Sequence, residues 1–217
     1  MNARNAVKAF EAFVGGERFP CLAAKGVVRQ RGYRLGIYDS LASLSATAAL
    51  ARDLAEFSAA IPTDGSGLVS FVAVFSGRPP SSELAFEKRL WRQLQQLSDR
   101  DTQPWDSSVS DNPEDPDFGF SFGGCGYFVV GMHPESGRVA RRFSRAALVF
   151  NPHAQFTRLR AAGRFERLRT VIRERDAIVQ GAPTTVLADH GERSEARQYA
   201  ARETSGEFRC PFHHRDG

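Results

Sequence analysis

Two of the five histidines stand where an imidazole could hold a metal. The five are His133, His153, His190, His213 and His214. His133 directly follows the apolar run 127–132, which is typical of a buried strand, and His153 lies just after the helix-starting pair Asn151-Pro152. From either position a histidine can ligate iron through one ring nitrogen while the other donates to a carbonyl or carboxylate. The alternative is that both are structural histidines with satisfied hydrogen bonds.

Basic residues follow His133 closely, at Arg138, Arg141 and Arg142. Guanidinium groups form bidentate contacts with carboxylates and phosphates, so this run could hold haem propionates or another anionic ligand. A solvated basic turn is the alternative interpretation.

Acidic residues crowd the segment 101–118, which also contains Trp105 and three prolines. A guanidinium substrate requires carboxylates and flat aromatic faces. Asp106, Asp115 and Asp117 are therefore candidates for holding one, and so is Glu87 beside Trp91. A solvated acidic loop would have the same composition.

The three cysteines are Cys21, Cys125 and Cys210, and no pair of them has C-x-x-C spacing. Cys21, in Phe19-Pro20-Cys21, could supply a thiolate to iron, but a buried inert thiol is the alternative. We interpret Cys210-Pro-Phe-His-His214 as a packed tail rather than a metal site. No secretory h-region and no stretch of about 18 apolar residues is visible, so we expect a cytoplasmic location with reduced thiols.

Composition narrows the class of protein. The chain has 217 residues, of which 41% are hydrophobic and 17 are Phe, enough for one domain with a core and an internal pocket. Only three of the 29 basic residues are Lys, and the net charge is +4 with acids interspersed, which argues against a nucleic-acid binder. We find no Gly-rich nucleotide loop, no G-x-S-x-G and no H-E-x-x-H.

The periodicity of apolar residues predicts the elements. Helices are expected at 1–18, 43–60, 82–100 and from Pro152 to Val179 with a break at Gly163. Strands are expected at 68–75, 118–132 and 146–150, with a strand or hairpin at 27–38, and 189–202 as a helix or ordered tail. This order predicts an α+β fold with a mixed or largely antiparallel sheet flanked by amphipathic helices in a single domain. We divide the chain into an N-terminal helix (1–18), the α+β domain (19–188) and a tail packed on it (189–217).

Motifs along most of the chain resemble the YqcI/YcgG-like family. They include Phe19-Pro-Cys21, 70–75, 86–91, Trp105-Asp106, 118–124, Phe128-Val-Val-Gly-Met-His-Pro134 with 138–143, 150–156, Glu195-Ala-Arg-Gln-Tyr199 and Cys210-Pro-Phe212. The resemblance implies a soluble haem protein that N-hydroxylates the guanidine group of L-arginine or a related guanidino amino acid. It would use haem b, O2 and an external electron donor such as a reductase. A haem enzyme of this small size could also form a homodimer.

The resemblance also implies roles for individual residues. It implies histidine rather than cysteine ligation of the iron, with His133 as the first expected ligand and His153 as the second. The expected haem contacts are Arg138, Arg141, Arg142, Phe128 and Cys21, and the expected catalytic acids are Glu87, Asp115 and Asp117.

Three other functions fit parts of the same pattern. A non-catalytic haem-binding or gas-sensing protein would share the His and Arg features. A non-haem iron oxygenase would use His133, His153 and a carboxylate such as Asp189 as a facial triad. An Arg-rich nucleic-acid binder would show salt-sensitive binding.

Overall fold

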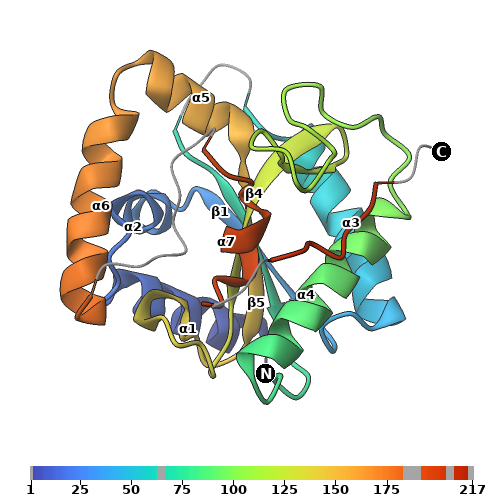
Figure 1. Cartoon of the computed structure of the whole chain (residues 1–217). Coiled ribbons are helices and arrows are strands. Elements are labelled where there is room, and N and C mark those ends of the chain that lie inside the picture. The colour runs from blue at the N-terminus through green and yellow to red at the C-terminus, as the bar shows by residue number, and fades with distance from the viewer. Residues whose placement is uncertain (1, 63–66, 183–191, 204–207, 215–217) are drawn as a thin grey trace.

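A five-stranded sheet forms the centre of the protein (Figure 1). The computed structural model describes residues 2–62, 67–182, 192–203 and 208–214. The strands are β1 (Tyr33–Tyr38), β2 (Ser70–Phe75), β3 (Phe120–Phe122), β4 (Cys125–Met132) and β5 (Ala146–Pro152), in the order β1-β2-β5-β4-β3. Only β1 and β2 run parallel, and the other neighbouring pairs are antiparallel.

Helices cover both faces of the sheet. In chain order they are α1 (Ala3–Gly15), α2 (Leu22–Arg29), α3 (Leu44–Ala59), α4 (Glu83–Ser98), the 3-10 turn η1 (Val139–Arg141), α5 (His153–Ala161), α6 (Phe165–Gln180) and α7 (Ala196–Ala200). Figure 1 shows α1, α2 and α6 on one side of the sheet and α3 and α4 on the other. The short helix α7 packs against β4 and α4.

Alternation along the strands divides the core in two. In β2, Phe71 and Phe75 join the aromatic-rich cluster that α3 and α4 cover. Val72 and Val74 point the other way, into a smaller cluster with Phe10 of α1. The α3 and α4 face is therefore filled by large side chains, whereas the α1, α2 and α6 face is less completely filled.

The fold class predicted from the sequence is confirmed: the sheet is mixed and mostly antiparallel, and the chain forms one domain. The fully buried β2 and the helix interruption at Gly163, where φ is +64°, also agree with the prediction. The tight β3–β4 turn uses Gly123 and Gly124, both at positive φ, as a two-residue hairpin requires.

Two local predictions were wrong. Residues 27–29 belong to helix α2, not to a strand or hairpin, although Val27 and Val28 have high strand propensity. The helix is anchored by tertiary contacts, since the buried Lys25 donates from Nζ to the Gly16 carbonyl at 2.8 Å. Asn151 does not cap α5 but lies in β5, where its side chain accepts from Ser70 Oγ at 2.7 Å and donates to the Phe128 carbonyl at 3.2 Å.

The predicted element at 189–202 is seen as α7, and Asp189 and His190 lie outside the described residues. The acidic segment 101–118 contains neither a helix nor a strand, as expected. In the described part of the chain, no helix is long and apolar enough to cross a lipid bilayer.

Candidate functional site

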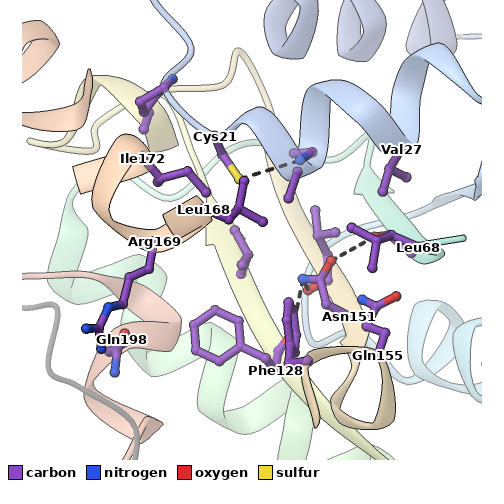
Figure 2. A pocket seen from close by; sticks show the side chains of 18 of the residues that line it. Cys21, Val27, Leu68, Phe128, Asn151, Gln155, Leu168, Arg169, Ile172 and Gln198 are labelled. Atoms are coloured by element: carbon purple, nitrogen blue, oxygen red, sulfur yellow. Dashed lines mark hydrogen bonds between the residues drawn. The ribbon is translucent and has the colours of Figure 1, made fainter. Parts of the chain in front are cut away.

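A cavity of about 350 Å³ lies between the less filled face of the sheet and helices α1, α2, α5 and α6. This volume is within the range of small-molecule and cofactor sites. Its walls are mainly apolar, and Figure 2 shows Leu168 and Ile172 of α6 facing Val27 of α2 across it. Side chains from alternate positions of β2, β4 and β5 form its floor: Val72, Val130, Met132, Val149 and Phe128.

Phe128, one of the residues expected to contact haem, contributes a flat ring to this floor. Its ring meets Phe156 and Tyr199 edge to face, at centroid distances of 6.4 and 5.9 Å. Aromatic neighbours on two sides fix the ring at the bottom of the cavity, where Figure 2 places it.

His153 lies in the cavity wall at the start of α5. Its Nε2 is 3.0 Å from Oε1 of Glu195, and the same oxygen is 2.5 Å from the hydroxyl of Tyr199. All three side chains are buried. Burial raises the pKa of Glu195, and the hydrogen bond from His153 opposes this rise. The arrangement matches a metal-ligating histidine whose second nitrogen donates to a carboxylate.

Two buried arginines of the predicted basic run reach the cavity. Arg138 forms an ion pair with Asp176 of α6, with 2.7 Å between Nη2 and Oδ2. Its Nε and Nη1 are buried without a hydrogen-bond partner among the described residues. Within the described ranges, Arg141 donates to backbone carbonyls alone, of which Gly131 at 3.0 Å is the nearest. Burial, and then the charge of Arg138, lower the pKa of Arg141 to about 9.

Two guanidinium groups and one carboxylate meet at this buried end of the cavity, so the cluster of Arg138, Arg141 and Asp176 carries a net positive charge. Asp176 can balance one of the two guanidinium groups but not both. A buried charge without a counter-ion is strongly unfavourable, so an anionic ligand group would stabilise this end of the cavity.

Cys21 lines the cavity at the start of α2 (Figure 2), and its Sγ accepts from the amide of Ala24 at 3.5 Å. Burial raises the pKa of its thiol, against the opposing effects of that hydrogen bond and of Arg141. A protonated thiol is a poor iron ligand. The structure thus places Cys21 in the site and favours a wall contact over ligation.

His133 lies outside the cavity. Because Met132 is part of the cavity floor, the next residue points to the opposite side of the sheet. There the His133 ring stacks on Phe86 of α4 at a centroid distance of 4.2 Å. Both ring nitrogens are buried with no partner among the described residues, and burial lowers the pKa of His133 to about 4. For a group bound in the cavity, His153 is therefore the better placed ligand.

The facial triad of the non-haem interpretation is not assembled. In the β4–β5 ladder, Tyr127 pairs with Pro152 and Met132 with Ala147, so the two histidines follow opposite ends of the ladder. These pairs are five residues apart, about 16 Å along the strands. His133 and His153 cannot share one ion at that separation, and no group of three metal-ligating side chains occurs in the described ranges.

The other predicted residues also lie away from the cavity wall. Arg142 is exposed and donates to the carbonyls of Ser136 and Gly137. Glu87 pairs with Arg202 at 2.5 Å on the α4 side of the sheet. Asp115 accepts from the amide of Asp117 within the acidic loop, and only Pro116 of that loop reaches the wall.

Sequence reasoning missed the roles of Glu195, Tyr199 and Asp176. Glu195 and Tyr199 have the i, i+4 spacing that places two side chains on one face of a helix, and that spacing was the available signal. Asp176 is one of several charged residues in α6, and nothing in the pattern distinguishes it from them.

Comparison with known proteins places the chain among its relatives. The model of the YqcI/YcgG family matches residues 10–213. YcgG of Bacillus subtilis (strain 168) is 27% identical over 206 residues, covering 90% of this chain and 81% of YcgG. YqcI of the same strain is 29% identical over 133 residues, covering 58% of this chain and 52% of YqcI. No solved structure gives a significant match. The names of the two relatives state no activity, but the family match covers nearly all of the sequence, and the chain therefore belongs to the YqcI/YcgG family.

Proposed function

We propose that this protein binds haem b in the cavity and N-hydroxylates the guanidine group of L-arginine or a related guanidino amino acid. The observation that carries the proposal is the make-up of the cavity wall. The floor and most of the walls are apolar. At one place His153 is hydrogen-bonded to the carboxylate of Glu195, and at another Arg138 and Arg141 give an excess of buried positive charge. A flat apolar macrocycle with an iron centre and two carboxylates has matching chemistry.

Each part of the wall has a role in this proposal. His153 would hold the iron, and Phe128 with the valines of the sheet would contact the porphyrin. Arg138 and Arg141 would hold the propionates, for which Arg138 offers Nε and Nη1. When bound, haem supplies O2 activation with electrons from an external donor such as a reductase, and the protein supplies position, charge and exclusion of water.

The substrate guanidinium needs a carboxylate nearby, both to orient it and to accept a proton. Glu87, Asp115 and Asp117 remain predictions for this role, at positions outside the cavity wall. Asp176 and Glu195 are the described acids that do line the cavity. Asp176 is already paired with Arg138 beside a second buried arginine, so Glu195 is the alternative that lies away from this positive charge.

The test is a haemin titration of the purified protein followed by absorption spectra of the ferric, ferrous and CO-bound forms. We expect a Soret band with a histidine-type CO complex, lost in His153→Ala and retained in His133→Ala. Loss with His133→Ala and retention with His153→Ala would contradict the assignment of the ligand.

Two variants of helix α2 test whether haem binds in this cavity. Ala24→Phe places a ring in the cavity and should abolish haem binding, whereas Leu22→Phe enlarges an exposed side chain of the same helix that does not line the cavity and should not. Equal binding by both would contradict the location.

The haem-loaded protein is then given reductant, O2 and L-arginine or its analogues, and products are analysed by mass spectrometry. A product with one added oxygen atom supports the oxygenase. Haem binding without any such product across the guanidino amino acids would favour the gas-sensing or carrier function.

A further inference from the structure

One carboxylate oxygen joins the cavity to the core behind it. Oε1 of Glu195 contacts Nε2 of His153 at 3.0 Å and the Tyr199 hydroxyl at 2.5 Å. None of the three residues is more than 8% exposed. Such a dry environment strengthens hydrogen bonds, and it makes the positions of the protons important.

The surroundings of Tyr199 restrict where its proton can go. The amide of Phe120 must donate, so the Tyr199 oxygen accepts from it, at 3.0 Å. The hydroxyl proton then has two acceptors, Oε1 of Glu195 at 2.5 Å and the Tyr127 carbonyl at 3.1 Å. The shorter contact assigns the proton to Glu195, which stabilises the ionised carboxylate.

Burial raises the pKa of Glu195, and the hydrogen bonds from His153 and Tyr199 and the charge of Arg160 oppose this rise. The ionised form is therefore assigned from the short contact with the Tyr199 hydroxyl. An ionised carboxylate can only accept hydrogen bonds, so in the neutral imidazole of His153 the donor must be Nε2.

We infer that Glu195 and Tyr199 are positioning residues that keep the Nε2–H tautomer of His153 and leave the lone pair on Nδ1 available to a ligand in the cavity. Nδ1 has no hydrogen-bond partner among the described residues. A donor bond from the second ring nitrogen to a carboxylate also fixes the orientation of the ring toward a bound metal. The metal-binding consequence rests on the proposed function, but the tautomer itself does not.

The tautomer is measured on the full chain without haem, by two-bond ¹⁵N–¹H correlation spectra of the histidine rings, with His153 assigned by the loss of its signals in His153→Gln. We expect His153 to be almost entirely the Nε2–H form. Glu195→Ala should give a mixture of both tautomers, and Glu195→Gln, whose amide oxygen can still accept, should restore the Nε2–H form. A predominant Nδ1–H form in the unmodified protein would overturn the inference, as would an unchanged tautomer in Glu195→Ala.

Tyr199→Phe tests the second residue, with Tyr127→Phe as a matched control. Both remove a buried hydroxyl, but that of Tyr127 bonds to Ser58 Oγ at 2.7 Å and not to Glu195. Without the Tyr199 hydroxyl, Oε1 of Glu195 loses the contact that holds it against Nε2 of His153, so Nδ1–H should increase in Tyr199→Phe alone. Identical spectra for the two variants would remove Tyr199 from the proposal. Dispersed amide spectra establish that each variant folds. If Glu195→Ala does not fold, the tautomer populations in Glu195→Gln and Tyr199→Phe decide the inference.

A second measurement uses the haem-loaded ferrous protein. Glu195→Gln replaces a charged acceptor by a neutral one, so the iron–histidine stretching frequency in resonance Raman spectra should shift from that of the unmodified protein. An unchanged frequency would show that Glu195 does not act on a bound ligand through His153. If haem does not bind, the proposed function fails, while the tautomer measurements still decide the role of Glu195 and Tyr199.

Discussion

The substitution Asp176→Ala is expected to destabilise the protein by about 3–5 kcal/mol, because it removes one partner of a buried ion pair. Arg138 and Asp176 are 2.7 Å apart, and their side chains are only 6% and 5% exposed. Arg141 lies nearby and donates to backbone carbonyls, so the variant would contain two buried guanidinium groups with no carboxylate paired to either among the described residues. For a domain of this size, that loss corresponds to a decrease in Tm of about 6–20 °C.

The assay is urea denaturation followed by circular dichroism at neutral pH. The matched control is Glu56→Ala, which breaks the Arg34–Glu56 pair of the same 2.7 Å length on the surface, where the side chains are 47% and 55% exposed. Breaking such an exposed pair should cost less than about 1 kcal/mol. The double variant Arg138→Met with Asp176→Leu removes both charges and should lose much less than Asp176→Ala. Equal losses for Asp176→Ala and Glu56→Ala would refute the argument that the cavity contains an excess of buried charge.

Two further predictions concern the opposite side of the sheet. Because burial lowers the pKa of His133 to about 4 from 6.5, the unfolded chain binds the extra proton first as the pH falls. The contribution of His133 to the free energy of unfolding is thus complete above pH 6.5 and declines toward pH 4 by up to about 3 kcal/mol. Denaturation of His133→Phe should therefore depend less on pH over that range. A pH dependence identical to that of the unmodified protein would contradict the prediction. Gly131→Ala should lose about 1–3 kcal/mol in the same denaturation assay, since its added Cβ would lie 2.7 Å from Leu90 and Phe86. Gly26→Ala, in a helix with open space, should instead gain about 0.5–1 kcal/mol, and similar effects at both glycines would count against the close packing of β4 on α4.

Much of the fold could be predicted because several elements are determined by the apolar pattern within their own segment. The unbroken apolar run ending at Phe75 indicated a central strand, and it forms β2 with every residue buried. The apolar spacing from Phe86 to Leu97 indicated the helix that forms α4. Where tertiary contacts override local propensity, as at Val27, the prediction from sequence was wrong.

The site was less predictable because it depends on which way neighbouring residues point. Arg141 lies in the cavity wall while Arg142 next to it is exposed, and a list of basic residues does not separate them. The strand alternation that turns His133 away from the cavity is set by the face that Met132 occupies. Pairing of His153 with Glu195 joins residues 42 positions apart, and periodicity contains no information on such a contact.

Because synthesis runs from the N-terminus, His153 is made 42 residues before its partner Glu195. All five strands and His153 have been synthesised before Glu195, Tyr199 and the buried Phe212 leave the ribosome. The sheet can therefore form while the α4 side of the core is incomplete and the histidine has no acceptor. A released chain truncated after residue 180 should bury its strands yet present His153 as a mixture of both tautomers, so the competence of the cavity to hold a ligand is acquired late, when the C-terminal segment docks.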